Sequence, residues 1–313
     1  MILALIFTFL KNVIYGASVF FTGSLAASTD ALDILALRFL LSFAVLYLLK
    51  ITKIVKIEVG IRDMLKPTAR RPYIKYLLLA ALFEPVLYML FETVGITMTT
   101  GITAGVLLSL NPVSGCICEE LLLKEKSTWL QKVFLALGIL GVVYIAVNTG
   151  SADGKDTLPG ILFLLLAVVT GSLFLVFSRK SSSKFSSFEV TYFASLWGAV
   201  VFNVINVVRH LIGGDILRYF EPFCSWDNLI GFVFLAIVST VIATSMNNYA
   251  MSKIQVSTSS AFGGVSTLVT VVIGVACGEA LHGFHYIGLA LILARMVGVS
   301  WIAIQKEKQT KLK

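Results

Sequence analysis

The chain has 313 residues, of which 58% are hydrophobic and 13% are charged, and its formal net charge at pH 7 is +8. A soluble globular domain carries about 25% charged residues, so this composition excludes a soluble globule. The mean hydropathy of +0.92 indicates an integral membrane protein.

The apolar residues fall into ten stretches of about 20 residues, the length that crosses the hydrocarbon core of a bilayer as a helix. These stretches are 2–25, 32–50, 73–94, 98–123, 129–148, 158–178, 187–212, 226–249, 256–277 and 284–304. We therefore expect an all-α integral membrane protein with ten transmembrane helices. A signal peptide that ends near Ser28 is the alternative for the first stretch, but Lys11 interrupts the stretch and no basic segment precedes it.

The fourth and fifth stretches are echoed by the ninth and tenth. Segment 107–141 has the layout of segment 261–295, at an offset of 154 positions. Five spans then occupy each half, and an odd number of spans inverts the second half in the membrane. We expect a first five-helix repeat at 1–150 and a second, inverted repeat at 151–313.

The basic residues outside the spans are unevenly divided between the two membrane faces. One face holds Lys155, Arg209 and Arg218, and all the others belong to the opposite face. The positive-inside rule therefore predicts a multi-pass protein of the cell membrane with both termini in the cytoplasm. This distribution accounts for the net charge without a nucleic-acid partner, because the basic loops face the membrane.

Span three places Glu84, Tyr88 and Glu92 along one helical stripe, at spacings of four. Pro85 lacks the hydrogen that would bond the carbonyl of residue 81, so we expect a bend beside Glu84. Glu84 and Tyr88 are candidates for substrate binding, and Glu84 for carrying a proton. The structural alternative is that Glu84 pairs with Lys11. Glu92 is either a coupling or gating group or an ordinary carboxylate at the membrane interface.

Spans one and eight carry further polar residues. Lys11 either reaches the membrane interface or faces a cavity, where it would serve coupling or gating. Tyr15 is a candidate for substrate binding, with packing as the alternative. Asn247 either lines the cavity and binds substrate or bonds across helices.

Three charged residues lie near the ends of spans. Arg38 follows Asp30 and Asp33, which favours an ion-paired anchor over ligand binding. Glu125 and Glu279 are expected at opposite membrane faces, where a gating role and a capping role are equally open. The histidines that follow Glu279 do not have zinc-ligand spacing, so we expect no metal site.

Several short segments occur in the order and spacing of a known family. They are Ile-Tyr-Gly at 14–16, Leu-Ala-Leu-Arg-Phe at 35–39, Thr-Thr-Gly-Ile-Thr-Ala at 99–104, Leu-Asn-Pro-Val at 110–113, Ser-Thr-Ser-Ser at 257–260 and Gly-Glu at 278–279. Over essentially its whole length, the chain resembles the EamA-type permeases of the drug/metabolite transporter superfamily. This resemblance implies a membrane transporter that exports or exchanges its substrate.

We expect a secondary transporter that moves a small polar metabolite, such as an amino acid or amine, by alternating access. The alternative is an integral-membrane enzyme acting on a lipid-linked substrate, but the sequence has no recognisable catalytic constellation. It also lacks an ATP-binding loop, since Lys155 is followed by Asp156. We expect no cofactor. The oligomeric state stays open, with a homodimer through spans five and ten as one option.

Overall fold

The computed structural model describes residues 2–57, 71–122, 128–149, 156–254, 259, 262–279 and 282–311. All regular secondary structure in these residues is helical, as predicted, and helices overlap each of the predicted apolar stretches. The long uninterrupted helices are α1 (Ile2–Ala26), α2 (Ala31–Ile51), α8 (Trp129–Thr149), α9 (Leu158–Ser181), α10 (Ser187–Gly213) and α15 (Gly283–Lys311).

The third stretch is a helix with a break at its centre. It consists of α4 (Arg71–Ala81), the π-helical turn η1 (Leu82–Leu87) and α5 (Tyr88–Thr97). Glu84 has non-helical backbone angles, with φ −140° and ψ 118°, and the peptide bond from Glu84 to Pro85 is cis. The predicted interruption beside Glu84 is therefore present, and it lies where proline removes a hydrogen-bond donor.

Other apolar stretches are divided as well. The fourth comprises α6 (Gly101–Leu108) and α7 (Asn111–Leu122), and Pro112 stands at the start of α7. The eighth comprises α11 (Trp226–Val233), the π-helical η4 (Phe234–Ala243) and α12 (Thr244–Lys253), and the ninth contains α14 (Gly263–Ala276). Two short 3₁₀ turns, η2 (Ile216–Arg218) and η3 (Glu221–Cys224), precede α11.

Six of these helical stretches are long and apolar enough to cross a membrane. They are Ile2–Ala26, Ala31–Ile51, Pro72–Thr97, Leu158–Ser181, Ser187–Gly213 and Trp226–Lys253. Gly263–Ala276 and Gly283–Arg295 are shorter apolar helices. The chain is therefore a multi-pass membrane protein.

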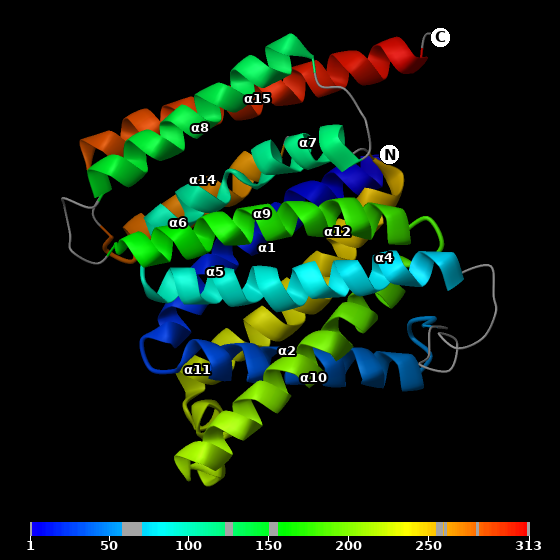
Figure 1. Cartoon of the computed structure of the whole chain (residues 1–313), viewed down its shortest axis with the longest axis vertical. Helices are drawn as coiled ribbons and strands as arrows, with labels where there is room; N and C mark the ends of the chain where they lie inside the picture. The colour runs from blue at the N-terminus through cyan, green and yellow to red at the C-terminus, as the bar shows by residue number, and fades with distance from the viewer. Residues whose placement is uncertain are drawn as a thin grey trace.

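Helices from the beginning of the chain pack on helices from its end. In Figure 1, α8 and α15 run side by side along one edge of the molecule, while α2 and α10 cross near the opposite edge. Between these pairs, α5 packs on α9 and α1 packs on α14. The rings of Phe39 and Phe202 stack at 5.6 Å between centroids and join α2 to α10. This arrangement places polar residues of distant segments close together.

Candidate functional site

A cavity of about 120 Å³ lies among α1, α5, α9, α12 and α14. Its lining includes polar side chains that the sequence singled out, namely Lys11, Tyr15, Glu84, Tyr88, Glu92 and Asn247. These residues come from α1, η1, α5 and α12, and the two pairs that share a helix, in α1 and in α5, are each four positions apart. Spacings of four place side chains on one face of a helix, which brings them to the same cavity wall.

Lys11 lines this cavity and is buried. Only 7% of the residue is exposed, and its ammonium nitrogen donates to the side-chain oxygen of Asn247 at 2.5 Å. The same ammonium lies 5.8 Å from the ring centroid of Tyr15. The Tyr15 hydroxyl is in turn 3.4 Å from the hydroxyl of Thr244, so α1 and α12 meet through polar groups.

Glu84 lines the cavity at the break in the third helix. The alternative of a Glu84–Lys11 ion pair is not found, since the ammonium of Lys11 instead bonds Asn247. Among the described residues, no hydrogen bond or ion pair holds the Glu84 carboxylate. The interrupted helix therefore presents an acidic group to the cavity without a fixed partner.

Tyr88 and Glu92 form a hydrogen-bonded pair one turn further along α5. The Tyr88 hydroxyl donates to a Glu92 carboxylate oxygen at 2.7 Å. Glu92 is 9% exposed and lines the cavity. The Glu92 carboxylate is therefore a buried group held by Tyr88 at the cavity. A hydrogen bond to the ionised form is one way to reduce the cost of burying a carboxylate.

Arg38 also lines the cavity, and the expectation that Asp30 and Asp33 anchor it is wrong. The residue is 2% exposed; its Nε donates to the Thr240 hydroxyl at 2.9 Å and its Nη2 to the Ser239 hydroxyl at 3.2 Å. Thr240 and Ser239 belong to η4. The sequence could not reveal these partners because they lie some two hundred positions away.

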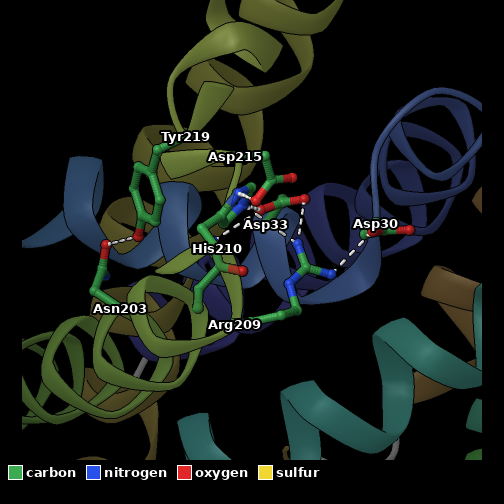
Figure 2. A network of polar contacts seen from close by, with 8 residues as sticks. Asp30, Asp33, Asn203, Arg209, His210, Asp215 and Tyr219 are labelled. Atoms are coloured by element: carbon green, nitrogen blue, oxygen red, sulfur yellow. Dashed lines mark hydrogen bonds and ion pairs between the residues drawn. The ribbon is translucent and has the colours of Figure 1, made fainter. Parts of the chain in front are cut away.

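Asp30 and Asp33 instead contact the end of α10, as Figure 2 shows. Asp33 accepts from Arg209 at 2.6 Å, and its other oxygen lies 2.8 Å from Nε2 of His210. Nδ1 of His210 is 3.0 Å from Asp215, while Arg209 also donates to Asp30 at 2.9 Å. This network ties the start of α2 to the end of α10, away from the cavity.

Tyr219 lies beside this network, with 5.4 Å between its ring centroid and that of His210 (Figure 2). Its hydroxyl donates to the side-chain oxygen of Asn203 at 2.6 Å. Burial raises the pKa of this hydroxyl above its usual value.

The cavity holds two basic groups, Lys11 and Arg38, and two acidic groups, Glu84 and Glu92. Among these four described residues, no basic nitrogen lies within 4.0 Å of an acidic oxygen. Lys11, Arg38 and Glu92 each contact neutral hydroxyl or amide groups instead. Ionisable groups inside a membrane protein are costly to bury and commonly line solute pathways. These separated basic and acidic groups can form hydrogen bonds with polar groups that enter the cavity.

Glu279 lies outside the cavity lining and caps a helix. Its two carboxylate oxygens accept from the backbone N–H groups of Gly101 at 3.0 Å and Ile102 at 2.9 Å, at the start of α6. A carboxylate there satisfies free donors and complements the helix dipole. Glu125, the corresponding residue of the first half, lies outside the described residues.

Two further charged residues at α6 did not stand out in the sequence. Asp156 accepts from the Thr100 backbone N–H at 2.5 Å and from the Thr103 hydroxyl at 2.9 Å. Arg295, only 2% exposed, donates to the carbonyl of Ser109 at 2.7 Å, just beyond the end of α6. Its position inside an apolar stretch was the feature of the sequence that could have marked Arg295 as a buried polar contact. In the described part of the chain, no cluster of three or more His, Cys, Asp or Glu residues could hold a metal.

Known proteins with similar sequences are transporters. The chain is 32% identical over 309 residues to "Uncharacterized transporter YcxC" of Bacillus subtilis (strain 168), covering 98% of this chain and 95% of that protein. It is 23% identical over 221 residues to "Uncharacterized transporter YyaM" of the same strain, covering 70% of each.

The fold also has a solved counterpart. One crystal structure matches with a TM-score of 0.67 and 18% sequence identity, over 97% of this chain and 98% of that one. The model of the EamA-like transporter family matches twice, at residues 2–147 and 158–301. The chain therefore belongs to the EamA-like transporter family.

Proposed function

We propose that this membrane transporter is a secondary transporter, acting as an exporter or exchanger of a small polar metabolite such as an amino acid or amine. The observation that carries the proposal is the convergence of Lys11, Tyr15, Glu84, Tyr88, Glu92 and Asn247 on one cavity. Lining residues from both ends of the chain support a solute path between two halves.

Within this proposal, residues 1–150 and 151–313 are two inverted five-helix repeats. Ten spans place both termini on the cytoplasmic side of the cell membrane. Alternating access then exposes the cavity to one face and then to the other. The two matches of the family model support this division of the chain.

The cavity residues receive distinct proposed roles. Tyr15, Glu84, Tyr88 and Asn247 contact the solute, because a tyrosine ring can stack and amide or carboxylate groups can orient polar groups. Glu84 exchanges a proton or a cationic solute group, a role supported by its lack of a fixed partner among the described residues. Lys11 and Glu92 adjust the charge of the cavity as the solute enters.

Gating is assigned to Glu279 and Glu125. The bonds of Glu279 to Gly101 and Ile102 join the turn after α14 to the start of α6, so breaking them would separate distant segments. Glu125 takes the corresponding role at the opposite face through the inverted repeat.

Purified protein in liposomes tests the function. We expect at least one small polar solute from a broad metabolite panel to stabilise the protein thermally and to show counterflow. Glu84→Gln, Asn247→Ala and Tyr15→Phe should each reduce counterflow, whereas Glu221→Gln, Asn228→Ala and Tyr286→Phe, all outside the cavity lining, should not.

Two results would overturn parts of the proposal. If no small solute crosses while a lipid-linked compound is chemically changed, the enzyme alternative replaces transport. If Glu84→Gln keeps the wild-type rate of counterflow at every pH, Glu84 has no part in proton coupling.

A homodimer is proposed through α8 and α15, the pair at the edge of the molecule in Figure 1. Both helices present large apolar side chains outward, among them Leu140, Val297 and Trp301. Light scattering in detergent micelles should give a dimer mass that falls to the monomer mass in Val297→Lys. A monomer mass for the wild type would contradict the proposed dimer.

A further inference from the structure

Three lysines and two tyrosines gather where α4 begins and α9 ends. Tyr73, Lys75 and Tyr76 lie in the first turns of α4, Lys180 lies in the last turn of α9, and Lys184 follows it. The ammonium groups of Lys75 and Lys180 lie 5.0 and 5.3 Å from the ring centroid of Tyr76. The ammonium of Lys184 lies 5.8 Å from the Tyr73 ring. These five residues are called the Lys–Tyr cluster.

The positive charges of the Lys–Tyr cluster are not neutralised by carboxylates of the described residues. No ion pair involves Lys75, Lys180 or Lys184 in that part of the chain, and their ammonium groups contact aromatic rings. A ring attracts an ammonium through its π face and leaves the ammonium with hydrogen-bond donors for other partners. Lys75 and Lys184 are exposed and Lys180 is half-buried. Three donors of like charge therefore remain accessible at one place.

An aromatic column leads from this cluster along α4 and α9. Tyr73 and Tyr76 lie 6.3 Å apart between ring centroids, Tyr76 stacks on Phe177 at 6.4 Å, and Phe177 stacks on Phe83 at 5.5 Å. All four rings are half-buried, so each has an accessible edge or face. The basic groups lie at the ends of α4 and α9. Phe177 and Phe83 extend the column toward the apolar middle of these helical stretches.

We propose that the Lys–Tyr cluster binds the phosphate headgroup of an anionic phospholipid whose acyl chain lies along this aromatic column. Charge complementarity selects an anionic headgroup, because the three accessible ammonium groups can bond phosphate oxygens. The apolar column selects a lipid over a free phosphate ion, since phosphate would leave it unoccupied.

The position of the site connects a bound lipid to the cavity. Phe83, at the inner end of the column, immediately precedes Glu84 in η1. A Cβ added to Gly171 of α9 would lie 2.8 Å from the Tyr88 ring, so α9 and α5 are in close contact there. A lipid that bridges α4 and α9 therefore stabilises the packing that positions Glu84 and Tyr88.

The test uses the full-length protein in neutral detergent micelles, with phosphatidylglycerol, phosphatidylcholine or inorganic phosphate added at matched concentrations. Native mass spectrometry measures the bound lipid, and thermal unfolding measures the stabilisation. We expect phosphatidylglycerol to bind at least about fivefold more tightly than phosphatidylcholine and to raise the Tm more. Inorganic phosphate should leave the Tm unchanged.

Variants locate the binding. Lys180→Gln with Lys184→Gln should weaken phosphatidylglycerol binding at least about tenfold, since each lysine near an anionic lipid contributes about 1 kcal/mol, or about fivefold. Lys56→Gln with Lys253→Gln removes the same charge from exposed lysines elsewhere and should change binding less than about twofold. Tyr76→Leu keeps every charge and should still weaken binding.

Lys180→Arg with Lys184→Arg keeps the charge and the ring contacts, and it should bind phosphatidylglycerol as the wild type does. Equal affinity for the two lipids would overturn the proposal. Equal losses of phosphatidylglycerol affinity in the two Lys→Gln double variants would also overturn it, as would any loss of affinity in the Lys→Arg double variant. A rise in Tm with inorganic phosphate equal to that with phosphatidylglycerol would overturn it as well. None of these outcomes bears on whether the protein transports a solute.

Discussion

The ammonium group of Lys11 lies 2.5 Å from the side-chain oxygen of Asn247, and this hydrogen bond joins α1 to α12 across 236 positions of the chain. Both residues are buried, at 7% and 2% exposure. A hydrogen bond from a charged donor contributes about 1.5–3 kcal/mol, and leaving a buried charge without its partner costs more. The contact therefore couples the two ends of the chain at the wall of the cavity.

We expect Asn247→Ala to lower the free energy of unfolding by about 3 kcal/mol or more, because it leaves the buried Lys11 ammonium without its acceptor. Lys11→Met should make a second Asn247→Ala substitution much less costly. Chemical denaturation of the two single variants and the double variant in detergent micelles measures the coupling free energy between Lys11 and Asn247. Strictly additive effects would contradict a direct energetic contact.

From the network in Figure 2 we expect substitutions of two neighbouring aspartates to differ strongly in their effect on the free energy of unfolding. Asp33 has a side chain only 12% exposed and contacts Arg209, His210 and Asn206, so Asp33→Asn should cost about 3–5 kcal/mol. The side chain of Asp30 is 74% exposed and its one ion pair within the described residues is with Arg209, so Asp30→Asn should lower the free energy of unfolding by less than about 1 kcal/mol. Unfolding midpoints of the two variants measure the difference. Similar losses would show that the network does not anchor α2 through Asp33.

The polar residues of the cavity could be selected from the sequence because each interrupts an apolar stretch. Their spacing alone predicted that Glu84, Tyr88 and Glu92 share one face of a helix. Pro85 predicted the break in that helix. The cavity itself depends on how distant helices pack. For this reason, the sequence left open whether Lys11 and Asn247 face it.

The hydrogen-bond partners of residues far apart in the chain could not be predicted from the sequence. The nearby aspartates suggested an ion pair for Arg38. In the structure they bond Arg209 of α10 instead, because the packing of α10 against α2 brings that arginine to them. The hydroxyl partners of Arg38 come from η4, whose π-helical backbone has no simple sequence signal. Similarly, the capping bonds of Glu279 became visible only once α6 was placed beside the turn after α14.

Glycine allows α1 and α14 to approach closely at Gly16. A Cβ there would lie 2.5 Å from the carbonyl oxygen of Ser266 and 2.8 Å from Cβ of Val269, so the helices must separate to admit it. We expect Gly16→Ala to cost about 1–3 kcal/mol. Gly23→Ala on the same helix meets its nearest atom at 3.7 Å and should be tolerated. Thermal unfolding compares them, and equal Tm values would show that α14 does not restrict α1 at Gly16.

The cap on α6 gives a fourth prediction. Glu279→Ala frees the N–H groups of Gly101 and Ile102 and removes a favourable interaction with the helix dipole, so a loss of about 1–2 kcal/mol is expected. Glu221→Ala, whose exposed partner Arg218 is 3.8 Å away, should change stability by less than about 0.5 kcal/mol. Hydrogen exchange at the start of α6 should rise only in Glu279→Ala. Unchanged exchange there would contradict the capping role.

Solute preference in proteoliposomes tests most directly the central claim that the solute binds in this cavity. Competition by a panel of polar metabolites for counterflow would be measured for the wild type, for Glu84→Gln with Asn247→Ala, and for the control Glu221→Gln with Asn228→Ala. We expect the cavity double to reorder or abolish the preference, while the control double keeps it. A cavity double with wild-type rate and preference would contradict the assignment of the solute site to this cavity.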